Sequence, residues 1–523
     1  MNQTLRWSIL TFTLILQLAF IGCRNSFDGP AQSVNRLPLI FPDYSEVTIP
    51  YNIAPLNFMV KEKAVQFQAV ITSAKTGLRI SQVKTDGIFQ FKESAWKKLL
   101  AESKGNKLTV EISARDSQGK VSRYLPFTIS VAADAIDPYM AYRLIYPGYY
   151  SWSDIKIEQR SLETFERKSV IENQIIEKNC VNCHSFRQND PNQFLIHMRG
   201  SKGGTYFSKD GQLIKTNLKT EKMLSGATYP YWHPGGRFVV FSSNMVKQSF
   251  YAQHSKSIEV YDQASSLILY DVEKNEIIGV PEDDQKQTLQ TFPTWSPDGK
   301  TLYYCEATLS DSAKNWDVRE IKSIHYNLVK KSFDETSVTF GKKEMVVDGQ
   351  SIQKSVSFPR ISPDGKFLAF TMADYGTFPI WHKEADLYML DIQNGNMKKM
   401  EINSTETDSY HSWSSNGKWL VFSSKRMDGR STRPYIAYVN SWDQIGKPFA
   451  LPQQDPTYYD KMVQSYNIPE LLKGEIRLTP RDFADATDKP VIQAKVGKNE
   501  SAVTARFGSP IATQQEIPNS AHE

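Results

Sequence analysis

The chain has 523 residues, which is enough for about three domains with substantial cores. Its 62 Lys and Arg against 57 Asp and Glu give a net charge of only +5, and no basic block stands out. The charge pattern therefore argues against a nucleic-acid-binding protein. The aromatic content of 25 Tyr, 27 Phe and 10 Trp favours a β-rich architecture.

The N-terminus has the features of an export signal. Arg6 precedes an apolar stretch that ends at Cys23, and this stretch is too short and too polar to span a membrane comfortably. The ending Ala19-Phe20-Ile21-Gly22-Cys23 resembles a bacterial lipobox, although Phe20 replaces the usual Leu. The resemblance implies a signal peptide at 1–22, lipidation of Cys23 and an anchored protein outside the cytoplasm, in the periplasm or at the surface, with the outer membrane favoured. The alternative is an ordinary cleaved signal with a chance cysteine.

Residues 23–45 are polar and contain proline, so we expect a tether. Residues 46–135 alternate apolar and polar side chains in short runs such as Val65–Ile71 and Phe127–Val131. Short strands separated by turn residues predict a small β-sandwich that acts as a spacer or docking module.

The segment 136–205 contains Cys180-Val181-Asn182-Cys183-His184. The pattern C-x-x-C-H is the attachment site of c-type haem, in which two thiols bind the porphyrin and the following His ligates the iron. We therefore predict one covalent haem c, with thioethers at Cys180 and Cys183 and His184 as the proximal iron ligand, in a short helical segment. The alternatives are a chance motif in a packed helix and a zinc site, which lacks a fourth ligand.

The sequence leaves the sixth iron ligand undetermined. Met198 and His197 follow His184 in an apolar run, and a Met ligand gives a higher potential than a His ligand. Another residue or an open position is equally consistent with the sequence. Arg199 has a guanidinium group that suits a haem propionate.

An internal repeat dominates residues 206–450. Phe292-Pro293-Thr294-Trp295-Ser296-Pro297-Asp298-Gly299-Lys300 recurs at 358–366, with variants at 229–237 and 410–418 and a truncated copy at 207–211. Pro, Asp and Gly in this order predict a tight turn, and an alternating apolar strand follows each full copy. Four strands with two turn signatures form a propeller blade.

The W-S-P-D-G-K pattern, followed by strands such as Asp386–Asp391, resembles the TolB-like β-propeller family. The resemblance implies a mainly β fold with a six-bladed propeller, within a range of five to seven blades, and says little about activity. Asp298 and Asp364 have a sufficient role as turn residues, and Cys305 is expected to be a small buried side chain. Residues 451–523 are predicted to form a strap that packs on the propeller, followed by a disordered tail.

These features favour a membrane-anchored haem protein that transfers electrons or senses redox state, with the propeller as scaffold. The alternative is a propeller adaptor for envelope proteins, peptides or glycans, in which the haem is structural or absent. An enzyme ranks last, because the sequence offers no nucleophile elbow, phosphate loop or convincing carboxylate pair. The lipid bilayer is the expected partner of Cys23, and the sequence does not identify a redox partner.

Overall fold

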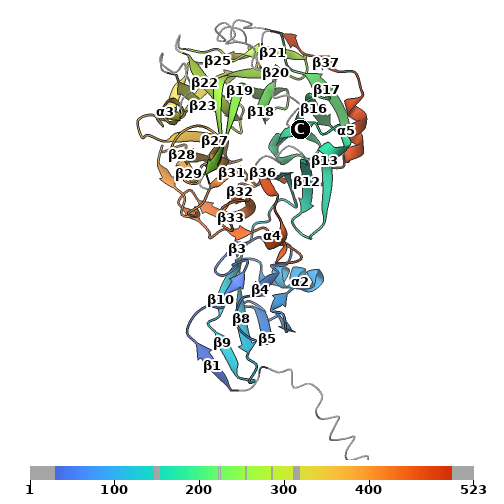
Figure 1. The fold of residues 1–523 in the computed structure, drawn as a ribbon, viewed down its shortest axis with the longest axis vertical. Helices are drawn as coiled ribbons and strands as arrows, with labels where there is room; N and C mark the ends of the chain where they lie inside the picture. Colours follow the sequence, from blue (N-terminus) through green and yellow to red (C-terminus); the bar gives the residue numbers. More distant parts are fainter. Residues whose placement is uncertain are drawn as a thin grey trace, which may run out of the picture.

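The computed structural model describes residue 27 and residues 30–146, 154–221, 223, 225–253, 256–283, 287–309 and 318–497. The predicted signal peptide, Cys23 and the tail beyond residue 497 lie outside these residues. The chain forms two bodies, a large one built from strands arranged in a ring and a smaller N-terminal one beneath its edge (Figure 1). No helix within the described ranges is long and apolar enough to cross a membrane.

The smaller body is the N-terminal domain. Its main sheet contains β1 (Ala31–Val34), β9 (Val121–Tyr124), β8 (Lys107–Arg115), β10 (Phe127–Val131), β3 (Thr48–Ile49), β5 (Gln66–Ser73) and β6 (Arg79–Lys84). A second sheet contains β2 (Ile40–Phe41), β4 (Phe58–Val60) and β7 (Ile88–Phe89), and the single helix is α2 (Glu93–Ser103). Trp96, Leu99 and Leu100 bury one face of this helix against the sheets. The domain starts inside the predicted tether, because β1 pairs with β9.

The larger body has a β-propeller fold, as predicted. Antiparallel pairing within the described ranges groups most of its strands into six units of four, and the second and third units are linked in one ten-stranded sheet by the parallel pair Ser265–Leu289. Units one to three contain β14 (Cys180–Phe186), β15 (Gln193–Arg199), β16 (Gly204–Lys209) and β17 (Gln212–Asn217); β18 (Ala227–Trp232), β19 (Phe238–Gln253), β20 (Lys256–Asp271) and β21 (Glu276–Gly279); and β22 (Thr288–Trp295), β23 (Thr301–Thr308), β24 (Asn327–Asp334) and β26 (Glu344–Val347), with β25 (Thr339–Phe340) beside them.

The remaining units use both ends of the propeller sequence. Units four to six contain β27 (Ser355–Ile361), β28 (Phe367–Ala373), β29 (Asp386–Asp391) and β30 (Met397–Lys399); β31 (Asp408–Trp413), β32 (Trp419–Ser424), β33 (Arg433–Ser441) and β35 (Phe449–Ala450), with β34 (Gln444–Ile445); and β36 (Ser465–Leu472), β11 (Tyr139–Ile145), β12 (Lys156–Ser161) and β13 (Arg167–Glu172). In unit six, β36 pairs with β11 from more than 300 residues earlier. The late strand thus joins the two ends of the propeller sequence.

Two boundaries in the sequence-based prediction are therefore wrong. The described part of the segment 136–205 is not helical, since it supplies β11 to β15 and the start of β16. The 3-10 turns η2 (Asn173–Ile175) and η3 (Arg187–Asn189) are the helical elements seen outside the gap at 147–153. The propeller units extend from residue 139 to residue 472, beyond the predicted limits of 206 and 450. Pairing with neighbouring strands supplies the backbone partners that a helix would have found within itself.

The predicted strap, 451–523, includes β36, which is a propeller strand, and continues along the propeller as far as residue 497. After β36 come α5 (Pro480–Thr487), β37 (Ile492–Gln493) and β38 (Lys495–Val496). β37 adds to the outer strand of unit one and β38 to the outer strand of unit two. Together with α4 (Tyr458–Lys461) before β36, these elements connect unit six to its neighbours. The short helices α3 (Val318–Lys322) and η4 (Pro379–Trp381) lie in loops between strands.

The repeated turn has the predicted chemistry. Asp298 accepts hydrogen bonds from the Ser296 hydroxyl (2.6 Å) and the Lys300 amide (3.0 Å), and Gly299 has φ of +72°. Asp364 makes the same contacts with Ser362 and Lys366. These aspartates are occupied as turn residues, which agrees with their assigned role.

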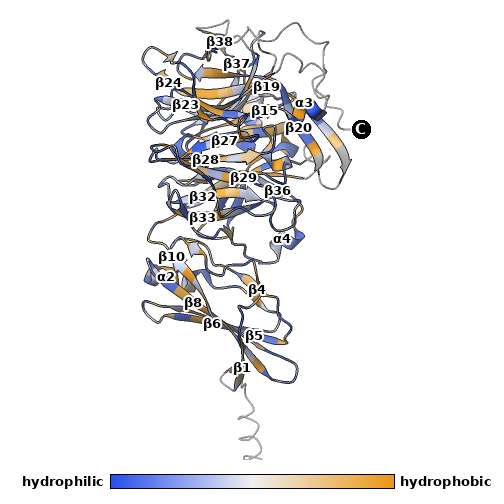
Figure 2. Ribbon diagram, turned by 90° about the vertical axis from the view of Figure 1, so that its left-hand side faces the viewer, coloured by the Kyte–Doolittle hydropathy of each residue, from blue (hydrophilic) through white to orange (hydrophobic). Residues whose placement is uncertain are grey.

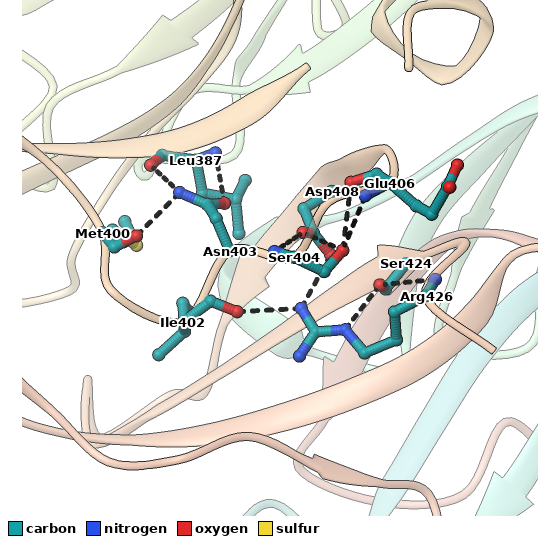
Figure 3. A network of polar contacts seen from close by, with 9 residues as sticks. All are labelled: Leu387, Met400, Ile402, Asn403, Ser404, Glu406, Asp408, Ser424 and Arg426. Atoms are coloured by element: carbon teal, nitrogen blue, oxygen red, sulfur yellow. Dashed lines mark hydrogen bonds and ion pairs between the residues drawn. The ribbon is translucent and has the colours of Figure 1, made fainter. Parts of the chain in front are cut away.

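A buried polar network joins the fourth and fifth units (Figure 3). The Asp408 carboxylate accepts hydrogen bonds from the Ser404 amide (2.6 Å), the Ser404 hydroxyl (2.8 Å) and Arg426 Nη2 (2.8 Å). Arg426 also donates to the Ile402 carbonyl and the Ser424 hydroxyl. The network fixes the connection between β30 and β31 against β32.

The N-terminal domain is packed on the fifth unit. One apolar core includes Trp96 of the domain and Trp419 of β32, and the Tyr438 hydroxyl donates to Asp134 Oδ2 (2.7 Å). Ser415 donates to Asp137 from both its amide (2.7 Å) and its hydroxyl (2.5 Å). The side view shows the domain beneath the rim of the propeller, with apolar segments running through the strands of both bodies (Figure 2).

Candidate functional site

The C-x-x-C-H motif lies on β14, the inner strand of the first unit. Cys180 is opposite Arg199 and Val181 is opposite Met198, and the register then breaks before His184 pairs with Ile196. Asn182 and Cys183 thus form a bulge, which alters the direction of the side chains around it. The motif is built into the propeller and does not belong to a separate cytochrome domain.

The same register break recurs in the inner strands of the other units. It falls at Tyr229, Phe292, Phe358, Tyr410 and Ile468, each of which has a positive φ. The aromatic rings among them are in contact in sequence order, with centroid separations of 4.6, 5.6 and 5.0 Å. Cys183 takes the corresponding place in unit one, is 3% exposed and receives a hydrogen bond from the Tyr229 backbone. Cys183 thus matches these residues in its place in the sequence pattern, but not in backbone conformation, because positive φ is found at the other five positions and not at Cys183.

His184 is enclosed between the first and sixth units. Its side chain is 0% exposed, and Nε2 lies 2.9 Å from the Ile468 carbonyl and 3.5 Å from Glu470 Oε1. Nδ1 is buried and has no hydrogen-bond partner among the described residues. Since Nε2 donates to the carbonyl, Nδ1 retains a free lone pair.

Burial shifts the pKa values of both titratable groups in this pair. It lowers the pKa of His184 to about 3, with a smaller contribution from the positive charge of Arg143. Burial also raises the pKa of Glu470 to about 8, although its side chain is 21% exposed. Both shifts favour the uncharged form of the group, so the contact between the imidazole and the carboxyl is weak as an ion pair.

A buried arginine from the sixth unit contacts the motif. Arg143 of β11 is 7% exposed, its Nη1 donates to Asn182 Oδ1, and its Nε has no partner among the described residues. Burial raises the pKa of the Cys180 and Cys183 thiols, while Arg199 and Arg143 oppose this increase. Both sulfurs are thus protonated thiols in a partly electropositive setting, and neither is in a disulfide.

The two candidate distal ligands lie on different faces of β15. Met198 shares an apolar cluster with Val181 and Phe186, on the face that meets the sixth unit. His197, the preceding residue, points to the other face, where its Nδ1 is 3.1 Å from the Thr205 hydroxyl. Burial lowers the pKa of His197 to about 3. The structure therefore brings only Met198 to the side of the strand that holds His184.

The donor set is compatible with haem c in chemistry. It offers two free thiols on one strand and a neutral imidazole with one unpartnered ring nitrogen, which are the groups that haem attachment requires. The described residues contain no cluster of three or more His, Cys, Asp or Glu side chains placed to hold a metal ion. The strand geometry departs from the predicted helical turn, so attachment requires a local change around the bulge.

Several residues of this site were not predicted. Arg143, Ile468 and Glu470 all come from the sixth unit, and none matches a known motif. One available signal was the pattern of a polar residue, an apolar residue and then Pro or His, found at 182–184, 228–230, 291–293, 357–359, 409–411 and 467–469. This pattern occurs in the inner strand of every unit, but it also occurs outside these strands, at 48–50, 323–325 and 377–379, so it does not identify the units by itself. Cys305 is fully buried, as expected.

The fold places the chain among β-propeller proteins. No protein-family model matches the sequence, and no curated protein matches it significantly. Similar solved structures include a nidogen/laminin complex, with a TM-score of 0.39 and 9% identity over 64% of this chain and 100% of that chain. The Swd1 propeller of Myceliophteria thermophila has a TM-score of 0.33 and 11% identity over 64% of this chain and 94% of that chain. An oligogalacturonate lyase from Vibrio parahaemolyticus has a TM-score of 0.33 and 10% identity over 58% of this chain and 92% of that chain. At these TM-scores the likenesses carry no argument, so the assignment depends on the strand pairing.

Proposed function

We propose that the chain is an exported, lipid-anchored protein that carries one covalent c-type haem and serves in electron transfer or redox sensing. The propeller is inferred to have six blades, with β36 as the closing strand. The observation that carries the proposal is the C-x-x-C-H motif on β14, with the His184 ring buried and its Nδ1 unpartnered among the described residues. A buried polar atom without a partner is costly, and a bound metal centre would satisfy it.

The chemistry assigned to each residue follows from its group. Cys180 and Cys183 would hold the porphyrin through thioethers, each formed by adding S–H across one vinyl group. His184 would ligate the iron through one of its two ring nitrogens. Nδ1 has no partner among the described residues in the present orientation of the ring. Nε2 would become free after a ring flip in which Nδ1–H donates to the Ile468 carbonyl instead. Haem, when bound, supplies a one-electron redox centre. Met198 is the better placed of the two candidate distal ligands.

A second candidate is an adaptor propeller without haem. It is favoured by the tight packing of the motif, since Cys183 already fills a position that aromatic residues take in most other units. His184 likewise already has one backbone partner in β36. In this case the propeller would bind an envelope protein, a peptide or a glycan.

Intact mass and the absorption spectrum of the exported protein separate these candidates. The wild-type chain is produced together with a c-type maturation system, beside Cys180→Ala/Cys183→Ala and the matched control Cys305→Ala. We expect the haem mass and sharp reduced-haem bands in the wild type and the control, and neither in the double variant. A wild-type chain of unmodified mass under these conditions would exclude the haem proposal and leave the adaptor.

The distal position is tested on the same material. If Met198 is the sixth ligand, Met198→Leu should lower the reduction potential and allow the reduced protein to bind carbon monoxide, while His197→Leu should change neither. The opposite pattern would assign His197, and carbon monoxide binding by the wild type would indicate an open site.

A further inference from the structure

The start of the folded domain is close to the proposed lipid anchor. Phe27 is 1% exposed, its ring lies 4.6 Å below the Arg115 guanidinium, and its carbonyl accepts a hydrogen bond from Arg123 Nη2 (2.9 Å). Cys23 precedes this fixed residue by only four positions. Consecutive Cα atoms are about 3.8 Å apart, so Cys23 cannot lie farther than about 15 Å from Phe27.

Apolar side chains are exposed around this point. The Val65 amide donates to the Arg115 carbonyl (2.9 Å), which places Val65 beside the residue that covers Phe27. Val65 is 51% exposed. Leu39 is 59% exposed, and its carbonyl accepts a hydrogen bond from the amide of Lys61, in the loop that leads to Val65 (2.8 Å). The surface near Phe27 therefore carries two large, exposed apolar side chains.

The charged side chains of the same region are mainly basic. Lys61, Lys63 and Lys120 are exposed or half-buried, and the turn that carries Lys120 directly follows Arg115. Of the nearby acidic groups, Glu62 pairs with Arg36 (2.7 Å), whereas Asp116, which accepts the amides of residues 118 and 120, and the exposed Asp86 keep their charges. We call Leu39, Lys61, Lys63, Val65 and Lys120 the basal surface. Figure 1 shows β1, β9 and β5 toward the end of the domain farthest from the propeller.

We propose that the basal surface rests on a lipid bilayer with anionic headgroups. This inference depends on the proposed lipidation of Cys23, because the short distance from Cys23 to Phe27 would hold this end of the domain at the headgroups. Lysines attract an anionic membrane surface, and exposed Leu and Val side chains can enter the interface. The N-terminal domain shares an apolar core with the fifth unit, so this contact would also orient the propeller above the membrane.

Vesicle binding by a chain that cannot be acylated tests the surface itself. The full mature chain with Cys23→Ser is mixed with vesicles of phosphatidylcholine, with or without phosphatidylglycerol. We expect salt-sensitive binding to the anionic vesicles only, weakened at least about tenfold by Lys61→Glu/Lys63→Glu/Lys120→Glu, since each basic residue near the surface contributes about fivefold. The matched control reverses Lys300, Lys342 and Lys366 on the propeller and should bind like the parent chain.

Hydrogen exchange on the acylated chain gives a second readout that does not need measurable affinity from the surface alone. On anionic vesicles, amides of residues 61–65 and 117–120 should exchange more slowly than in the unacylated chain in solution. Unchanged exchange there, or equal loss of binding in the propeller control, would overturn the proposal. Absence of acyl groups on Cys23 by mass would refute the anchor, and the vesicle assay would still decide the surface.

Discussion

Shortening one side chain of the closing strand should destabilise the whole propeller. Leu472 of β36 is fully buried, lies opposite Tyr139 of β11 and belongs to the apolar cluster between the sixth and first units. Leu472→Ala removes three carbon atoms, which corresponds to about 2.4 kcal/mol of transfer free energy. The cavity left behind adds to this loss, so we expect a decrease of about 3 kcal/mol in the free energy of unfolding.

The assay is urea unfolding followed by tryptophan fluorescence, combined with hydrogen exchange of the amides in β11 to β13. These amides should exchange faster in the variant, because β36 is the inner neighbour of β11. Leu125→Ala is the matched control, since this leucine is exposed and its truncation should change stability by less than about 0.5 kcal/mol. A change below about 1 kcal/mol for Leu472→Ala, with unaltered exchange in β11, would refute the role given to β36.

Three further predictions concern other parts of the propeller. Asp408→Ala should lower the free energy of unfolding by about 3 kcal/mol in urea titrations, because it leaves Arg426 without its buried carboxylate, whereas loss of the exposed Asp455–Lys461 pair should change it by less than about 1 kcal/mol. Burial raises the pKa of Asp262 from 3.8 to about 7, so its contribution to stability is complete below pH 3.8 and is lost as the pH rises to about 7. The free energy of unfolding of Asp262→Asn, taken relative to wild type, should therefore be higher at pH 8 than at pH 4. An equal difference at both pH values would contradict this. Gly299→Ala should lower the melting temperature more than Gly395→Ala, because a Cβ added at 299 would lie 2.2 Å from the His233 ring, whereas a Cβ at 395 meets no described residue beyond its chain neighbours within 4 Å. Equal decreases in melting temperature would show that only the positive φ of the two glycines matters.

The sequence predicted the units whose turns follow the repeat. Ser296 to Lys300 and Ser362 to Lys366 specify their turns locally, through side-chain hydrogen bonds and a glycine with positive φ. Such turns can be recognised from a few adjacent residues.

The first and sixth units could not be recognised from the sequence, for two different reasons. In the first unit, Cys183-His184 replaces the aromatic-Pro pair, and the turn after β14 contains Arg187-Gln188-Asn189 in place of Ser-Pro-Asp-Gly. The truncated copy at 207–211 proved to be the turn between β16 and β17, a different position in the unit. The sixth unit combines strands from opposite ends of the chain, and no local period can reveal such a pairing.

The candidate site, like the fold, was predictable only where adjacent residues specify it. The motif identifies Cys180, Cys183 and His184 by their spacing alone. Arg143 and Glu470 reach it only through the pairing of β11 with β36, so their part depends on tertiary structure. The prediction that lipid attaches at Cys23 concerns a residue outside the described ranges and stays a prediction.

The Ile468 carbonyl reaches His184 from a strand 284 residues later in the chain, so the ring is enclosed only after β36 has taken its place. If the chain carries haem as proposed, the cysteines would have to react before β36 packs against β11 and β14. Slow delivery of the cofactor would then favour a closed but empty protein, and the yield of loaded molecules would depend on which of the two assembly steps is faster.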